Sequence, residues 1–135
     1  MGEPALKHVA AALAIRDGQI LLARRAPGQS LAGLWEFPGG KQEPNETIQQ
    51  CIEREIREEL SLSCTAGKVL TESVYRYVGG AIKLIGVIVE LDKSEPILSV
   101  HDCVTWAPID KVLSFQLAPA DIPIAKEVMH VAGPN

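Results

Sequence analysis

The chain has 135 residues, of which 47% are hydrophobic and 22% charged, and its formal net charge is −4. This length supports one hydrophobic core, so we expect a single globular domain over residues 1–135. The negative charge excludes electrostatic capture of a nucleic-acid polymer. The apolar segments are too short to span a membrane, so we expect a cytoplasmic protein. The three cysteines lack CxxC spacing, which predicts neither disulfides nor a zinc site.

The N-terminal third predicts a hairpin followed by a long loop. Residues 8–15 are apolar, Asp17-Gly18 is a turn signal, and residues 20–25 form the second strand. Residues 26–44 are punctuated by glycine and proline, so we expect a loop there, with a short strand at residues 34–37. A long structured loop in a small domain is often functional.

The remaining chain predicts a central helix, a second hairpin and a terminal helix. Thr47 and Gln50 form a capping box that opens a helix over residues 48–60. Asp121 is a plausible N-cap for the last helix. The other expected elements are strands 69–78, 81–91 and 104–107, a short helix over 108–115, and the terminal helix 121–131. Together these elements predict an α+β sandwich.

Three carboxylates stand close together on the central helix. Glu55, Glu58 and Glu59 have the spacing i, i+3 and i+4, which puts them on one side of the helix. Taking Glu55 as the origin, the apolar stripe Ile48, Ile52 and Ile56 runs from ~20° to ~100°, and Glu59 lies within it at ~40°. We therefore expect Glu59 to be partly shielded from water, which favours a Mg²⁺ site.

The alternative is a solvated face whose acidic residues are neutralised by arginines. Glu53 can pair with Arg57, and Arg54 can pair with Glu58, each one helical turn apart. Glu55 and Glu59 have no cation at that spacing, so ion pairing explains the acidic cluster only in part.

A longer motif surrounds these carboxylates. The run Gly40-x5-Glu46-x7-Arg54-Glu55-Ile56-x-Glu58-Glu59-x-Ser61-Leu62 resembles the Nudix box, G-x5-E-x7-R-E-U-x-E-E-x-G-U, in which U is a bulky aliphatic residue. The one departure is Ser61, where the box has its final glycine. The helix must therefore end with Ser61 in a left-handed conformation or close in another way.

Two further segments extend the resemblance over most of the chain. The segment from Leu34 to Lys41, LWEFPGGK, is similar to the lead-in of the MutT-type members of the Nudix family. The segment from Leu117 to Pro123, LAPADIP, resembles the tail of the bacterial CTP pyrophosphohydrolases in that group. The resemblance implies an α/β/α sandwich with a mixed sheet, attack of water at a phosphorus, and clearance of damaged or unwanted nucleotides.

The same resemblance implies roles for individual residues. Glu55, Glu58, Glu59 and the backbone carbonyl of Gly39 are expected to hold Mg²⁺, for which Mn²⁺ is a substitute. Arg54 is expected to orient a metal-binding carboxylate, most simply Glu58 one turn away. Of the remaining basic residues, Lys41 corresponds to a lysine that assists the leaving phosphate, and Arg25 to an arginine near the phosphates of the nucleotide.

The general base is missing from its usual position. Family members often carry a glutamate six residues before a strand tryptophan, and counting back from Trp106 gives Val100, which cannot accept a proton. Asp102, His101 or the helix carboxylates remain as substitutes, although His101 is also compatible with an ordinary loop histidine.

Asp121 corresponds to the position that reads the nucleobase. A carboxylate there can accept a hydrogen bond from an exocyclic amine, but an N-cap role explains the same residue equally well. The aromatic residues that can stack on a base, or simply pack in the core, are Phe37, Trp35, Tyr75 and Tyr77.

These features predict a pyrophosphohydrolase that converts a nucleoside triphosphate, such as 8-oxo-dGTP or CTP, to the monophosphate. The expected partner is this small nucleotide alone, and the expected assembly is a monomer or a weak homodimer. Cleavage of a nucleoside diphosphate derivative such as ADP-ribose is an alternative. A silent nucleotide-binding domain is another, because Val100 replaces the expected glutamate.

Overall fold

The computed structural model describes residues 6–133. Its strands are β1 (Lys7–Arg16), β2 (Gln19–Arg25), β3 (Trp35–Glu36), β4 (Gly39–Lys41), β5 (Cys64–Tyr77), β6 (Gly80–Leu91) and β7 (His101–Pro108). The helices are α1 (Ile48–Leu60) and α2 (Ile122–Ala132), with two short 3₁₀ helices, η1 (Ile109–Ser114) and η2 (Pro119–Asp121), between β7 and α2.

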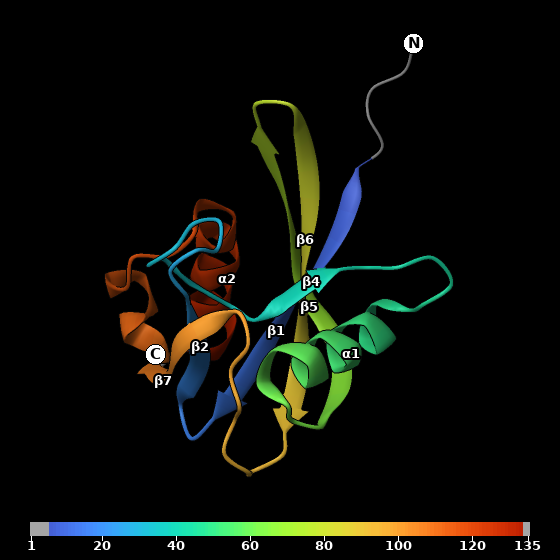
Figure 1. Cartoon of the computed structure of the whole chain (residues 1–135). Helices are drawn as coiled ribbons and strands as arrows, with labels where there is room; N and C mark the ends of the chain where they lie inside the picture. The colour runs from blue at the N-terminus through green and yellow to red at the C-terminus, as the bar shows by residue number, and fades with distance from the viewer. Residues whose placement is uncertain (1–5, 134–135) are drawn as a thin grey trace.

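The strands form a mixed sheet. Its central order is β3-β2-β1-β6-β5, with β4 added to β1 and β7 added to β2. Strands β1 and β6 are parallel, whereas the other pairs are antiparallel. In Figure 1, α1 and α2 lie on opposite sides of β1, so the expected α+β sandwich with a mixed sheet is confirmed.

The alternation of side chains along β1 builds two cores. Ala10 and Ala12 face α1 and pack with Ile52 and Ile56, whereas Leu13 faces α2 and packs with Ile124. Small alanines on β1 let the helices approach the sheet closely. Both faces of this central strand are therefore buried, and its ends fix the positions of the loops around it.

The hairpin and the loop predicted in the N-terminal third differ in detail. Strands β1 and β2 pair only next to their turn, where Ile15 pairs with Ile20 and Arg16 with Gln19. Further from the turn the two strands separate, because β1 pairs with β6 and β2 pairs with β7. The loop predicted over residues 26–44 contains the unexpected strand β4 as well as the predicted β3.

Later strand boundaries also differ from the prediction. Strand β5 begins at Cys64 rather than Val69, and β7 begins at His101 rather than Val104. No helix within residues 6–133 is long and apolar enough to cross a membrane.

Candidate functional site

Helix α1 has defined ends that fix the rotation of its acidic face. Thr47 accepts a hydrogen bond from the Gln50 amide at 3.0 Å, and the Gln50 side chain accepts one from the Thr47 amide at 2.8 Å, which confirms the capping box. At the other end, Ser61 has φ 55° and ψ 35°. The helix thus ends in the left-handed conformation, the first of the two predicted endings.

Glu59 is the most enclosed of the three helix carboxylates. It lies above the apolar stripe, and its Oε1 accepts a hydrogen bond of 3.2 Å from the Gly39 amide. Burial, reinforced by the negative charges of Glu36 and Glu55, raises the pKa of Glu59 to about 8. The shielding predicted from the helical rotation is present.

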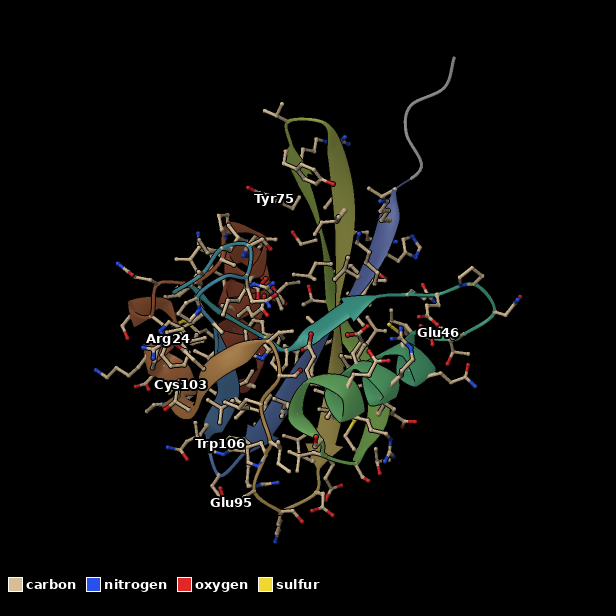
Figure 2. All side chains as sticks on the ribbon, in the orientation of Figure 1. Arg24, Glu46, Tyr75, Glu95, Cys103 and Trp106 are labelled. Carbon is tan, nitrogen blue, oxygen red and sulfur yellow. The ribbon has the colours of Figure 1, made fainter. Side chains whose placement is uncertain are left out.

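Glu55 and Glu58 share one arginine. Arg54 donates to Glu55 Oε1 at 2.8 Å and contacts Glu58 at 3.3 Å, and its shortest bond, 2.7 Å, goes to Glu46. The predicted contact of Arg54 with Glu58 is present, but Arg54 binds Glu46 and Glu55 at shorter distances, and Glu55, which has no cation one helical turn away, is neutralised by the residue next to it. Helical spacing alone misses both the adjacent residue and the loop carboxylate that precedes α1 in Figure 2.

The environments of Glu55 and Glu58 differ strongly. The Glu55 side chain is 14% exposed, and burial raises its pKa above the ordinary value despite the neighbouring Arg54. The Glu58 side chain is 58% exposed, and its contact with Arg54 is at 3.3 Å. A further difference from the sequence-based pairing is that Glu53 accepts a hydrogen bond from the Ala66 amide at 2.9 Å.

Two glycines allow β4 to pass against α1. A Cβ at Gly39 would lie 1.9 Å from the carbonyl oxygen of Ala10, and one at Gly40 would lie 2.4 Å from the carboxyl carbon of Glu55. A side chain therefore does not fit at Gly39, where it would meet backbone, and one at Gly40 would require the Glu55 carboxylate to move. This close approach brings the backbone of Gly39 within hydrogen-bonding reach of Glu59.

A second polar cluster joins three strands beside α1. Glu36 Oε2 accepts hydrogen bonds from Arg25 Nη1 at 3.1 Å and is 2.8 Å from His101 Nε2. Arg25 also binds Ser30 and Gln29 of the following loop. His101 is 4% exposed at the start of β7, so its interpretation as a loop histidine is wrong.

Sequence reasoning missed Glu36 as a member of the site. The short strand at residues 34–37 is a signal that this residue is held in place. Its partners, however, come from β2 and from β7, which begins 65 residues later. Only the sheet pairing reveals the contact.

Asp121 lies in the wall of a small cavity. Its Oδ2 accepts a hydrogen bond of 2.8 Å from the Phe37 amide, and it makes no side-chain bond to the amides of α2. Asp121 thus occupies the predicted N-cap position of α2, but its side chain does not cap the helix. The cavity has a volume of about 150 Å³ and is lined chiefly by apolar residues, with Glu36 as the other carboxylate. Burial raises the pKa of Asp121 to about 8.

The other candidate residues lie in less enclosed surroundings. Lys41 is exposed at the end of β4. Asp102 forms an exposed ion pair with Arg24 at 2.8 Å, and the carbonyl of Val100 binds the Ala26 amide. Tyr75 and Tyr77 stack with ring centroids 6.3 Å apart, and Figure 2 shows Tyr75 on the part of the β5–β6 hairpin that projects away from α1.

The donor chemistry around α1 suits a divalent cation. Within residues 6–133, no three Asp, Glu, His or Cys side chains converge on a single point in their present conformations. Glu55 and Glu59 are nevertheless hard-oxygen donors that burial penalises as bare anions, and the exposed Glu58 can rotate toward them. Such a set fits Mg²⁺, which needs few protein ligands beside water and phosphate.

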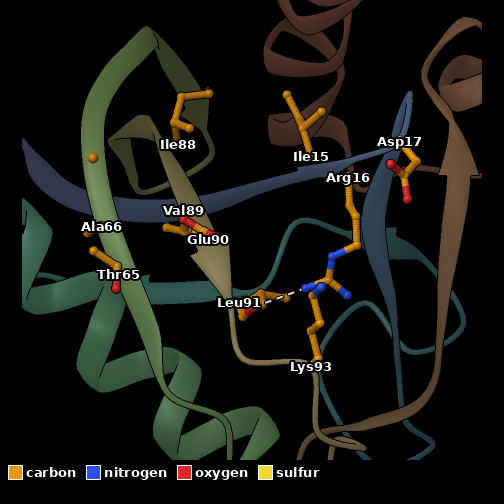
Figure 3. A pocket seen from close by; sticks show the side chains of 11 residues that line it. Ile15, Arg16, Asp17, Thr65, Ala66, Ile88, Val89, Glu90, Leu91 and Lys93 are labelled. Carbon is orange, nitrogen blue, oxygen red and sulfur yellow. Dashed lines mark hydrogen bonds between the residues drawn. The ribbon is translucent and has the colours of Figure 1, made fainter.

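A larger cavity lies elsewhere on the sheet. It has a volume of about 590 Å³ and is formed by the ends of β1, β5 and β6 (Figure 3). Its arginine, Arg16, already donates to the Leu91 carbonyl at 3.0 Å and lies 4.8 Å from the ring centre of Trp106. None of the three helix carboxylates lines it, so this cavity is separate from the candidate site.

Comparisons with known proteins identify relatives of the chain. Residues 6–128 match the family described as NUDIX domain. The chain is 39% identical to the CTP pyrophosphohydrolase of Escherichia coli K12, over 90% of each protein, and 28% identical to the 8-oxo-dGTP diphosphatase of that organism, over 85% of this chain and 89% of the relative.

A solved structure agrees with these relatives. The solution structure of the E. coli ORF135 protein is 36% identical and superimposes with a TM-score of 0.82, covering 96% of this chain and 94% of the other. A MutT protein from Methanosarcina mazei has the same TM-score at 24% identity, with 96% of each chain covered, and thus shares the fold.

Proposed function

The chain belongs to the Nudix family, and from this membership we propose that it hydrolyses a nucleoside triphosphate to the monophosphate and pyrophosphate in a Mg²⁺-dependent reaction. Mn²⁺ is proposed as a substitute metal. We further propose that the protein acts in the cytoplasm as a monomer or weak homodimer.

The observation that carries this proposal is the environment of Glu59. A carboxylate whose burial raises its pKa to about 8, with Glu36 and Glu55 as acidic neighbours, is poorly stabilised by the protein alone. A divalent cation brought by a nucleotide would offset this cost. The proposal of Mg²⁺ is further supported by its general role in phosphoryl transfer, where it neutralises phosphate charge and acidifies a bound water.

Each residue has a proposed part in the reaction. Glu55, Glu58, Glu59 and the carbonyl of Gly39 would hold the metal, which would supply charge neutralisation and a more acidic water. Arg54 orients Glu55 and Glu58 through the contacts described above. The exposed ammonium of Lys41 reaches the leaving phosphate. Arg25 contacts a phosphate through Nη2, whose bonds to Gln29 and Ser30 are long at 3.4 Å, because its other donors hold Glu36 and the Ser30 carbonyl.

The proton acceptor is proposed to be a helix carboxylate. Asp102 is engaged by Arg24 and His101 by Glu36, so both candidates near Val100 are already paired. Glu58 is the most accessible of the helix carboxylates to water. A base on the helix that binds the metal needs no glutamate at position 100.

The cavity beside Asp121 supports a preference for CTP. A cavity of about 150 Å³ is large enough for one flat six-membered ring, because apolar cavities of that size bind benzene. Phe37 lines the cavity, and the carboxyl of Asp121, whose raised pKa of about 8 keeps it protonated at neutral pH, can donate a hydrogen bond to the ring nitrogen N3 of cytosine. The 39% identity with a CTP pyrophosphohydrolase supports the same base. 8-Oxo-dGTP is the second proposed substrate.

A nucleotide panel tests the proposal. Purified protein with Mg²⁺ is incubated with CTP, dCTP, UTP, 8-oxo-dGTP and ADP-ribose, and the nucleoside monophosphate, pyrophosphate and phosphate formed are each measured separately. Pyrophosphate release in equal amount to the monophosphate is expected, with CTP fastest. Phosphate release alone, or faster cleavage of ADP-ribose, would contradict the proposed reaction. Nucleotide binding without turnover would indicate a silent domain.

A further inference from the structure

A buried histidine is joined to the carboxylate that lines the nucleobase cavity. His101 is 4% exposed, and its Nε2 lies 2.8 Å from Glu36 Oε2. Its other nitrogen, Nδ1, is buried and has no hydrogen-bond partner within the described residues. Because Glu36 already accepts from Arg25, the Glu36 carboxylate is the acceptor and His101 Nε2 the donor.

The two donors leave one Glu36 oxygen available. Both Arg25 Nη1 and His101 Nε2 bind Oε2, and no donor from the described part of the chain binds Oε1. The Glu36 side chain also lines the cavity that contains Asp121. Its charge acts on both sites, since it raises the pKa values of Asp121 and Glu59. An oxygen fixed in this way can accept a hydrogen bond from a ligand.

The sheet register holds the three groups rigidly. Glu36 pairs with Ala23 across β3 and β2, and Arg25, two residues further along β2, pairs with His101 of β7 after a register shift between Arg24 and Arg25, so Glu36 lies beside both donors. A site built on paired strands is more precise than one on a free loop. Loss of the His101 bond would leave Glu36 held by Arg25 alone.

We propose that His101 is a positioning residue for nucleobase specificity, which orients Glu36 so that Oε1 accepts a hydrogen bond from the exocyclic amine of the base. This inference rests on the proposed function and extends it. A base with an amine, such as cytosine, satisfies the carboxylate, whereas uracil presents an oxygen acceptor in place of that amine and is rejected.

The test compares the turnover of CTP and UTP in variants that change the contact between His101 and Glu36. In His101→Phe, the ratio of the kcat/KM values for CTP and UTP should fall roughly tenfold, the factor expected when one hydrogen bond to a charged group is weakened. The change should lie in KM, with kcat for CTP little altered. His101→Gln should preserve the ratio, because its terminal amide can donate to Glu36.

A double variant separates positioning from structure. In a Glu36→Gln background, His101→Phe should cause no further loss of selectivity, because its effect passes through the Glu36 carboxylate. Asp102→Asn is the matched control on the same strand: it breaks the exposed ion pair with Arg24 and should leave the ratio unchanged. An unchanged ratio in folded His101→Phe, or a further loss in the double variant, would overturn the proposal.

Binding measurements keep this test independent of turnover. Affinities for CMP and UMP, measured by calorimetry without metal, should show the same loss of preference in His101→Phe and its retention in His101→Gln. If the wild type cleaves no triphosphate, the proposed function fails, and these affinities alone decide the role of His101. A nitrogen NMR spectrum should also show the His101 proton on Nε2, and a proton on Nδ1 alone would contradict the contact.

Discussion

Asp121 combines burial with a position in the nucleobase cavity, and this combination predicts a pH-dependent stability. The pKa of Asp121 is raised to about 8, whereas the same group in an unfolded chain titrates near about 3.9. The folded state therefore holds a proton that the unfolded state releases between these values. Stability falls as the pH rises through this window and reaches its lower level above the folded pKa.

Asp121→Asn should flatten that dependence. The amide cannot ionise and still offers an oxygen to the Phe37 amide, so the free energy of unfolding should rise by a few kcal/mol at pH 8, since each pH unit between the two pKa values is worth about 1.4 kcal/mol. At pH 4 the two proteins should differ little. Urea unfolding at both pH values measures this. Equal pH dependence in the two proteins would contradict the buried, proton-bound carboxyl.

Glu58 gives a prediction of the opposite kind, with a large effect on turnover and a small effect on stability. Because its side chain is 58% exposed, Glu58→Gln should change the free energy of unfolding by less than about 0.5 kcal/mol. Loss of a metal ligand and proton acceptor should lower kcat by about 100-fold or more. Glu43→Gln, another exposed carboxylate beside Arg54, is the control and should keep its activity. Retained activity in Glu58→Gln would reject its assignment to the site.

The helix residues were more predictable than the residues of the cavity. The shielding of Glu59 follows from its rotation relative to Ile52 and Ile56, which is a local property of one helix. The bond between Asp121 and the Phe37 amide joins residues 84 positions apart. No local sequence pattern can reveal a contact across that many residues, so the sequence left the N-cap and ligand-binding roles of Asp121 open.

The end of α1 shows how one substitution within a motif is tolerated. Ser61 adopts φ 55°, a conformation that costs a residue with a side chain roughly 1 kcal/mol and glycine almost nothing. Ser61→Gly should therefore raise the free energy of unfolding by about 0.5–1 kcal/mol. Chemical denaturation provides the measurement, and Ser61→Ala, which keeps the Cβ, is the matched control. A stabilised alanine variant would show that the backbone conformation is not the cause.

Strand β4 escaped prediction because its sequence lacks any strand signal. Gly39 and Gly40 have low strand propensity, yet they pair with Ala11 and Ala10 of β1. The pairing depends on close backbone approach, which a Cβ on Gly39 would block at the Ala10 carbonyl. Helix α1, by contrast, carried a capping box and an apolar stripe, so its bounds were predicted correctly.

The assembled molecule explains why the two halves of the site arise from distant segments. Helix α1 packs on one face of β1 and α2 on the other, so Glu59 and Asp121 reach the site from opposite layers. Strand β3, at the end of the sheet order, carries Glu36, whose charge influences both. The layered fold was implied by the family resemblance, but the meeting of these carboxylates required the sheet register.

Metal binding should therefore be linked to the stability of the whole chain. A ligand that binds only the folded state at tenfold above its dissociation constant adds about 1.4 kcal/mol, or roughly 3–6 °C in Tm for a chain of this size. We expect Mg²⁺ to raise Tm by such an amount at pH 8.5, where Glu59 is largely ionised, and EDTA to reverse the increase. The gain should be smaller at pH 6, because protons then compete for the carboxylate.

Glu59→Gln distinguishes metal linkage from simple charge removal. Its neutral amide is not penalised by burial and can still accept from the Gly39 amide, so the metal-free variant should be more stable than the wild type at pH 8.5. The same variant should lose most of the Mg²⁺-dependent rise in Tm, because a hard-oxygen anion has been removed. Calorimetric scans of both proteins with Mg²⁺ and with EDTA measure the two effects together. A metal-free variant no more stable than the wild type would argue against the buried charge, and an undiminished Mg²⁺ effect would place the ion away from α1.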